Sequence, residues 1–312
     1  MKSLAFHLPA ALMMVASAAP AAEHPYPADV VAPGAKLVTL YEADRFFEGP
    51  TWDPQTAKLY FTSFQKTGPR AFNPETEVLR LDELGKATVW LAKAEGLNGT
   101  CLARGGGLLG AQAFGHRLML FGFGPMEPSS TRVLLYDTAL NQPNDVCQAP
   151  GGDIYFTDPD FKDRKTSAVY RLTKDGKAQK ILDDMPLPNG LKTSLDGKTL
   201  YVGDSHEQWW RSYPIRDDGT VGAGRVFFKP QDWQGVPDGF CLDSTGRLYL
   251  SAGNGLWVVE PDGKPVGLIP LDTFCSNAAF GGPDGRTLYM TCDKKLYSLA
   301  MQVRGPRNRS DE

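Results

Sequence analysis

A short phrase recurs six times along this chain, at a spacing that few folds accommodate. Each copy contains a polar residue, a glycine or a residue in its place, an apolar run, a polar turn and a second apolar run. Successive copies start 39 to 50 residues apart. They begin at Glu48-Gly49, Asn98-Gly99, Asn144-Asp145, Asn189-Gly190, Asp238-Gly239 and Asn277-Ala278. A strand-rich repeat of this period predicts an all-β fold, a six-bladed β-propeller.

The fourth copy, PNGLKTSLDGKTLYVGD from Pro188, shows how one blade is built. Its two apolar runs, 191–194 and 199–203, flank an Asp-Gly turn, which is a strong hairpin signal. Outer strands are expected to follow, as at 168–173 and 255–260. The sixth copy leaves room for only three strands before the C-terminus. We therefore expect residues 36–41 to supply its fourth strand and close the ring, which removes exposed edges.

The first 22 residues have the layout of a secretory signal peptide. Lys2 precedes an apolar run at 4–15 and small residues at 16–22. The run is too short to span a bilayer, so a retained anchor helix is the weaker alternative. We divide the chain into a signal peptide (1–22), a propeller domain (30–303) and a C-terminal tail (304–312). The mature protein is expected to be exported, periplasmic or secreted, with no membrane insertion after cleavage.

Charge excludes one class of partner. The 312 residues carry a formal net charge of −3 and no strongly basic segment, so we expect no nucleic-acid partner. The oligomeric state is left open.

The five cysteines fall into two groups. Cys101, Cys147 and Cys241 each lie three residues after the polar residue of their copy, which predicts buried thiols on inner strands. Cys275 and Cys292 flank one predicted hairpin, and we formulate the hypothesis that they form a disulfide across it. No Cys/His zinc pattern occurs.

The six polar residues are the candidate site, because a propeller brings one from each blade toward a common axis. All are oxygen donors: Glu48, Asn98, Asn144, Asn189, Asp238 and Asn277. Two converging carboxylates would repel unless a cation lies between them. Hard oxygen donors suit Ca²⁺ best, with Mg²⁺, Mn²⁺ or Zn²⁺ as alternatives. A single Asn-Gly pair would indicate only a turn, but the change to an acid in two copies favours a site.

Other residues are expected on the same face. The second strand of each blade ends beside the start of the first, which places Asp158, Asp204 and His206 near this rim. We expect Asn98 and His206 to contact substrate, and the segment 65–76 and Trp233 to form pocket walls. No GxSxG nucleophile motif and no phosphate-binding loop occur. Hydrolysis assisted by a metal ion is therefore the simplest enzymatic interpretation.

Five segments, in order, carry a specific resemblance. They are FEGPTWDPQTAKLYFTS, PNDVCQAPGGDIYFTDP, PNGLKTSLDGKTLYVGD, PDGFCLDSTGRLYLSA and SNAAFGGPDGRTLYMT. Together they resemble the family of senescence marker protein, gluconolactonase and luciferin-regenerating enzyme over about residues 38–300. The resemblance implies a six-bladed propeller with a divalent metal, commonly Ca²⁺, on its axis. Many members of that family hydrolyse sugar lactones, and relatives hydrolyse other esters or organophosphates, so the resemblance implies a small-molecule lactone or ester as the partner.

By this resemblance, the metal ligands are Glu48, Asn189 and Asp238. Asn144 is a further ligand or a substrate contact, and Asp238 is also the catalytic proton acceptor and donor. The second copy, LNGTCLARGGGLLGAQ, departs from the family pattern. The arginine and glutamate that bind sugar hydroxyls in animal members have no clear counterpart, so the resemblance leaves the substrate open.

The expected function is that of an exported, metal-dependent, gluconolactonase-like lactonase. Two alternatives stand beside it. The first is an aryl-ester or phosphotriester hydrolase on the same site, suggested by aromatic residues at Phe161, Trp209, Trp210 and Trp233. The second is a non-catalytic ligand-binding propeller, because a fold alone does not decide function.

Overall fold

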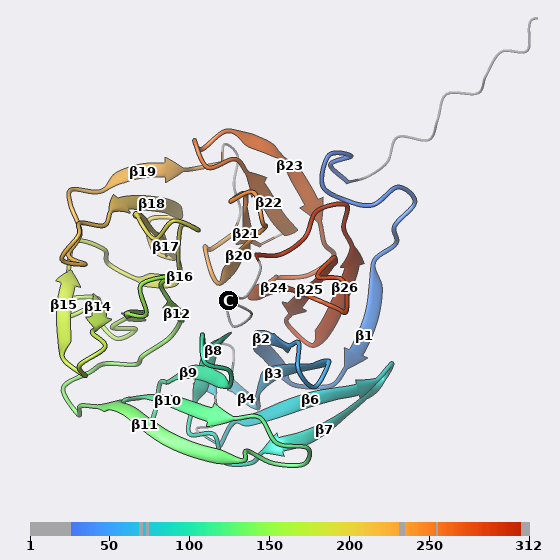
Figure 1. Ribbon diagram of the computed structural model, residues 1–312, viewed down its shortest axis with the longest axis horizontal. Coiled ribbons are helices and arrows are strands. Elements are labelled where there is room, and N and C mark those ends of the chain that lie inside the picture. The colour runs from blue at the N-terminus through green and yellow to red at the C-terminus, as the bar shows by residue number, and fades with distance from the viewer. Residues whose placement is uncertain (1–25, 69–70, 73–74, 231–234, 254, 307–312) are drawn as a thin grey trace, which may run out of the picture.

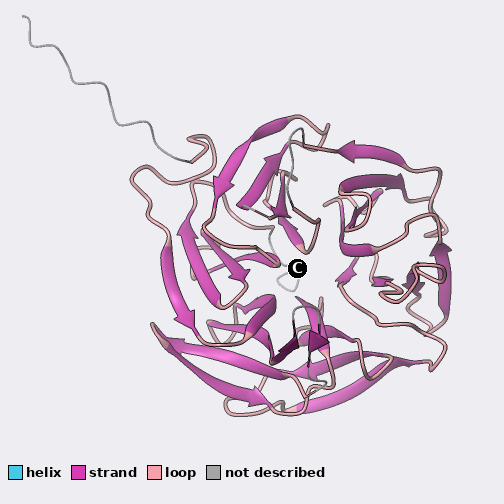
Figure 2. Cartoon of the chain, turned by 180° about the vertical axis from the view of Figure 1, so that it is seen from behind, coloured by secondary structure: helices cyan, strands magenta, loops and turns pink. Residues whose placement is uncertain are grey.

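The structure of this chain is a computed structural model that describes residues 26–68, 71–72, 75–230, 235–253 and 255–306. The predicted signal peptide and Trp233 lie outside the described residues. Strands dominate the described chain, which contains no helix (Figure 2). Accordingly, no helix in these ranges is long and apolar enough to cross a membrane.

Six four-stranded antiparallel sheets surround a common centre, which makes the fold the predicted six-bladed propeller (Figure 1). Blade 1 consists of β2 (Phe46–Asp53), β3 (Lys58–Phe64), β6 (Glu77–Glu83) and β7 (Lys86–Leu91). Blade 2 consists of β8 (Leu97–Leu102), β9 (Leu108–Gln112), β10 (Arg117–Gly122) and β11 (Ser130–Tyr136). Blade 3 consists of β12 (Val146–Gln148), β13 (Ile154–Asp158), β14 (Ala168–Leu172) and β15 (Ala178–Leu182).

The second half of the ring repeats this plan. Blade 4 consists of β16 (Pro188–Thr193), β17 (Thr199–Asp204), β18 (Trp209–Pro214) and β19 (Arg225–Phe228). Blade 5 consists of β20 (Phe240–Leu242), β21 (Leu248–Ala252), β22 (Gly255–Val259) and β23 (Pro265–Pro270). A two-stranded hairpin, β4 (Lys66–Gly68) and β5 (Ala71–Phe72), lies within the segment 65–76 that was expected to form a pocket wall.

Blade 6 combines the two ends of the described chain. It contains β24 (Asn277–Gly281), β25 (Thr287–Cys292), β26 (Lys295–Ala300) and, as its outermost strand, β1 (Val38–Glu42). β1 pairs antiparallel with β26, with Val38 opposite Ser298 and Glu42 opposite Lys295. The isolated bridge between Val31 and Met301 adds a second connection between these ends.

The hydrophobic core lies between the blades. Six buried clusters occupy the six interfaces between neighbouring sheets, one cluster to each interface. In blade 4, for example, Trp210 packs against Phe228 and the cluster continues into Phe240 and Leu250 of blade 5. The core therefore holds the sheets together side by side and leaves the axis to polar groups.

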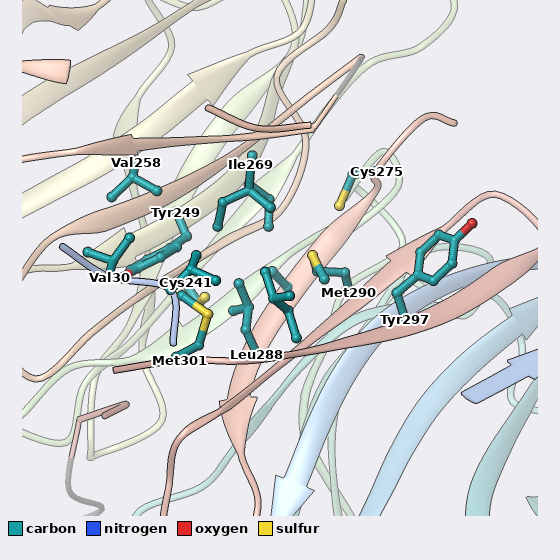
Figure 3. Close-up of a cluster of buried hydrophobic side chains, with 14 of the residues drawn as sticks. Val30, Cys241, Tyr249, Val258, Ile269, Cys275, Leu288, Met290, Tyr297 and Met301 are labelled. Carbon is teal, nitrogen blue, oxygen red and sulfur yellow. The ribbon is translucent and has the colours of Figure 1, made fainter. Parts of the chain in front are cut away.

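The five cysteines are all free thiols, so the disulfide hypothesis for Cys275 and Cys292 was wrong. Asn277 pairs with Thr291, a register that places Ser276 rather than Cys275 in line with Cys292. Both thiols are fully buried in the cluster between blades 5 and 6, in which Figure 3 labels Cys275. The sulfur of Cys275 contacts the carbonyl oxygen of Asn277 at 3.6 Å. Cys147 and Cys241 are buried on inner strands as predicted, and Cys101 is half-buried.

Candidate metal and catalytic site

The six polar residues of the repeat lie at the start of the six inner strands, and we call them the axial residues. Glu48, Asn98, Asn189 and Asn277 are within β2, β8, β16 and β24. Asn144 and Asp238 lie two positions before the first residues of β12 and β20. These six strands form the innermost ring of the propeller (Figure 1), and each packs beside the next around the axis.

Backbone bulges aim several of these side chains. The register of β2 against β3 shifts by one residue between Glu48 and Thr51. β8 against β9 and β16 against β17 shift one position earlier in the repeat, between Leu97 and Thr100 and between Pro188 and Leu191. A bulge inserts an extra residue and redirects a side chain out of the regular alternation. The polar–glycine pair of the repeat thus forms the bulge in blades 2 and 4, whereas in blade 1 Glu48 is still paired with Thr62 and the bulge begins at Gly49.

The glycine of the pair permits neighbouring blades to approach. A Cβ on Gly190 would lie 2.2 Å from the carbonyl oxygen of Asp238, and a Cβ on Gly239 would lie 2.0 Å from Cγ of Asn277. Both distances are far below van der Waals contact, so a larger residue would force the blades apart. The polar residue of the motif supplies a side chain at the axis, and the glycine after it lets the inner strand of the next blade approach closely.

The two predicted acids come together at the axis. Glu48 is 4 % exposed, and its Oε2 accepts hydrogen bonds from the Gly49 N–H at 2.7 Å and from the Asn277 side-chain amide at 3.0 Å. Burial raises the pKa of Glu48 to about 7, and the nearby Asp145 carboxylate adds to the rise. The pKa of Asp238 is raised well above its ordinary value by burial, then by Glu48 and Asp145. The expected mutual repulsion is therefore present.

Asn189 provides the clearest sign of a missing partner. Its side-chain N–H₂ donates to Ser205 Oγ at 3.0 Å, while its Oδ1 is buried and accepts no hydrogen bond from the described residues. Ser205 in turn donates to the carbonyl oxygen of Pro237 at 2.6 Å, next to Asp238. Buried carbonyl oxygens without a partner are rare and call for an explanation, such as an ion.

The other predicted site residues divide by position. Asn144 is 7 % exposed, and its carbonyl oxygen accepts from the Gly99 N–H at 2.8 Å, which ties blade 2 to blade 3. Asn98 is half-buried on β8. His206 is exposed, and the hydrogen bond it makes to Asp204 is through its backbone N–H.

The aromatic residues that suggested an aryl substrate do not form one wall. Trp210 is fully buried in the interface between blades 4 and 5. Trp209 is half-buried with the Lys229 ammonium 4.8 Å from its ring centre, while Phe161 is 47 % exposed on a different blade. These three residues have separate surroundings, and Trp233 lies outside the described residues, so the aryl-ester alternative stays a prediction.

Two charged residues were not anticipated from the sequence. Asp145 is 2 % exposed and lies beside the axial acids, and its carboxylate is 3.5 Å from the Lys192 ammonium. Burial raises the pKa of Asp145, an effect that Lys192 opposes. The available signal was that Asp145 takes the place of the glycine in its copy of the repeat, and Lys192 takes the place of a cysteine.

The donor set fits a hard divalent cation. Among the described residues, no three His, Cys, Asp or Glu side chains form a metal-binding group. An ion here would therefore depend on amide oxygens together with the carboxylates, and Asn189 offers a buried amide oxygen that has no other partner. Carboxylate and amide oxygens are the ligands that Ca²⁺ prefers. Glu48, Asn144, Asn189 and Asp238 would hold it.

Comparison with known proteins points to one family. The family model described as SMP-30/Gluconolactonase/LRE-like region matches residues 46–294. A gluconolactonase of Zymomonas mobilis is 31 % identical over 193 residues, which are 53 % of this chain and 52 % of that protein. The match thus spans about half the length of that relative.

Two solved structures extend the similarity over most of the chain. The first, a gluconolactonase from Xanthomonas campestris, has 30 % identity and a TM-score of 0.74, covering 87 % of this chain and 91 % of that one. The second, described as a calcium-binding regucalcin from Agrobacterium tumefaciens, has 21 % identity and a TM-score of 0.67, covering 85 % and 96 %. At that identity the second structure supports the fold alone.

Proposed function

This chain belongs to the SMP-30/gluconolactonase/LRE-like family, and on that premise we propose that it is an exported lactonase that opens a sugar lactone with one divalent cation, Ca²⁺ first among candidates, on its axis. The observation that carries the proposal is the axial site itself. Glu48 and Asp145 contribute buried carboxylates, Asp238 contributes a half-buried one, and Asn189 adds a buried amide oxygen that has no hydrogen-bond partner among the described residues. A purely structural channel would have no need for this charge.

The reaction assigns a distinct task to each group. A bound dication would supply Lewis-acid polarisation of the lactone carbonyl. Asp238, partly exposed at the axis, takes a proton from the attacking water and returns it to the ring oxygen. Water adds to the carbonyl carbon, the ring C–O bond breaks, and the product carries one carboxylic acid and one hydroxyl group. Asn144 and Asn98 orient the substrate by their side-chain amides.

Two hydrogen bonds hold the acids in place for this task. The Asn277 amide donates to Glu48 from the neighbouring blade, and the Gly239 N–H donates to Oδ1 of Asp238 at 3.1 Å. Each bond fixes one carboxylate oxygen and stabilises the ionised form. His206, exposed at the rim, would contact only the outer part of a substrate.

The proposal is tested by acid release from δ-gluconolactone in a pH-stat. We expect turnover to be lost in EDTA and restored by Ca²⁺, and Asp238→Asn to lower it by a factor on the order of 10²–10⁴ without loss of the fold. Asp217→Asn removes the same charge at an exposed site and serves as the control. Full turnover in Asp238→Asn would contradict the assignment. Cation binding without acid release from any lactone would instead favour a non-catalytic propeller.

Export is tested separately. The layout of residues 1–22 supports cleavage near Ala21 or Ala22. Expression of the full chain in a Gram-negative host should yield periplasmic protein whose N-terminus, determined by sequencing, begins close to residue 22 or 23. An intact Met1 in a cytoplasmic fraction would contradict export and would leave the lactonase proposal unaffected.

A further inference from the structure

Two exceptions to the repeat pair with each other. The residue after the axial one is glycine in four copies, alanine in one and Asp145 in the third. The residue three positions after the axial one forms a second layer: Thr51, Cys101, Cys147, Lys192, Cys241 and Phe280. Asp145 is the acidic exception among the residues that follow the axial ones, and Lys192 is the basic exception in the second layer. The two come from neighbouring blades and meet at 3.5 Å, Nζ of Lys192 to Oδ2 of Asp145.

The lysine reaches the axial site from the opposite end of the ring. All six residues of the second layer line one cavity of about 300 Å³, which also contacts the turns after the inner strands at Pro150, Ser194 and Leu195. We call it the rear cavity. The Lys192 side chain is only 18 % exposed there, and its ammonium also lies 5.9 Å from the Phe240 ring centre. Its stem is thus held by packing, with its charge directed toward Asp145.

A count of charges shows the consequence. With all three carboxylates ionised, as a bound dication would favour, Glu48, Asp145 and Asp238 contribute three negative charges, and Lys192 contributes one positive charge, which leaves −2. Without Lys192 the buried site would carry −3, and Asp145 would be a buried carboxylate without its ionic partner. Uncompensated buried charge is strongly unfavourable.

We infer that Lys192 is a positioning residue, the fixed internal counter-ion of the axial site, which pairs with Asp145 from the rear cavity and sets the site's charge to match a single dication. The inference rests on the proposed function, since it assumes that the axial residues bind a divalent cation. Among the described residues, the ion-pair partner of Lys192 is Asp145, which is not itself a predicted ligand. It acts through Asp145, next to Asn144, and adjusts how strongly the site attracts a cation.

The test measures Ca²⁺ affinity by isothermal titration calorimetry, in low salt, for the wild type and four variants. Lys192→Met makes the site more negative, so we expect binding at least about tenfold tighter than wild type. Asp145→Asn makes it less negative, and we expect binding weaker by a similar factor. The double variant restores −2 and should return close to the wild-type affinity. Lys180→Met, which removes an exposed lysine on the outer strand β15, is the matched control and should not change affinity.

The outcomes separate charge from structure. Weaker binding in both single variants, with no recovery in the double variant, would show that the pair only supports the fold and would overturn the inference. Unchanged affinity in Lys192→Met would overturn it equally. If Lys192→Met does not fold, the comparison of Asp145→Asn with the double variant decides, because the inference requires the double variant to bind more tightly. Wild-type protein that binds no divalent cation would overturn the proposed function first.

Discussion

At the scale of single residues, the chain concentrates its buried charge in a few side chains. Glu48, Asp145 and Asp238 surround the axis, and burial raises the pKa of each. Away from the axis, Asp158 at the end of β13 is also fully buried. Its Oδ2 accepts from the Asn141 N–H at 2.9 Å, while its Oδ1 accepts no hydrogen bond from the described residues. Asp158 therefore allows buried charge to be tested apart from metal binding.

Asp158→Asn is predicted to stabilise the protein at neutral pH more than at acid pH. Burial raises the pKa of Asp158 from 3.8 to about 6, although bonds from Asn141 oppose the rise. The native state then holds its proton more tightly than the unfolded state, so this group costs stability as pH rises from about 4 to 6. The full cost, on the order of 3 kcal/mol, applies above pH 6. The asparagine removes it.

Urea unfolding of both proteins at pH 4.5 and pH 8 measures this difference. The variant's advantage should be larger at pH 8 than at pH 4.5. Asp217→Asn, at an exposed position, provides the comparison. An advantage that is equal at the two pH values would show that Asp158 is not a buried charge in the native state.

At the scale of the strand pair, the polar–glycine motif links one inner strand to the next. The Gly99 N–H donates to the carbonyl oxygen of Asn144, and the Gly239 N–H donates to that of Ser276 at 2.7 Å. Thr100 adds a side-chain bond to the carbonyl oxygen of Gly49 at 2.6 Å. Neighbouring inner strands are thus joined by backbone hydrogen bonds at positions where a glycine leaves room for close approach.

Gly190→Ala is predicted to destabilise the fold by about 1–3 kcal/mol, because its Cβ would meet the backbone of Asp238 at 2.2 Å and Gly239 Cα at 2.7 Å. The obstacle is backbone, which cannot rotate away. Gly151→Ala is the control, since a Cβ there meets nothing within 4 Å, and it should be neutral or slightly stabilising. Urea midpoints measure both, and equal midpoints would contradict the prediction.

At the scale of the whole molecule, the ring depends on both ends of the chain. β1 forms the outer edge of blade 6 beside β26, and Val30 and Val31 are buried in the cluster between blades 5 and 6. Backbone hydrogen bonds join the N-terminal segment to the end of β26: the Gln302 N–H donates to Val30 O at 2.8 Å, and the Ala32 N–H donates to Ala300 O at 3.0 Å. The N-terminal segment that contains β1 precedes blade 1 in the sequence but belongs to blade 6 in the structure.

Removal of residues 1–42 is predicted to expose β26 as an unpaired edge and to cause association or loss of stability. Removal of residues 1–25 leaves β1 in place and should keep the urea midpoint of the mature protein. Size-exclusion chromatography and urea unfolding of the two truncated proteins test this. A monomeric 1–42 deletion with an unchanged midpoint would show that β1 is dispensable.

Local patterns in the sequence determined the strands and the ring. Asp-Gly turns between apolar runs predicted the hairpin that became β16 and β17, and the outer strands expected at 168–173 and 255–260 became β14 and β22. The period of the repeat predicted six blades, because strand content and spacing are properties of neighbouring residues. The same repeat identified the axial positions, since equivalent residues in each blade occupy equivalent places.

Tertiary structure alone decided which charges meet. Lys192 and Asp145 are 47 residues apart and belong to different blades, so their pairing depends on how blade 3 packs against blade 4. The expected disulfide was wrong for the same kind of reason. The register of the hairpin places Cys292 in line with Ser276, one residue away from Cys275. The sequence set the period and the polarity of each position, whereas contacts between blades set the electrostatics, because charge interactions depend on distance in space and on burial.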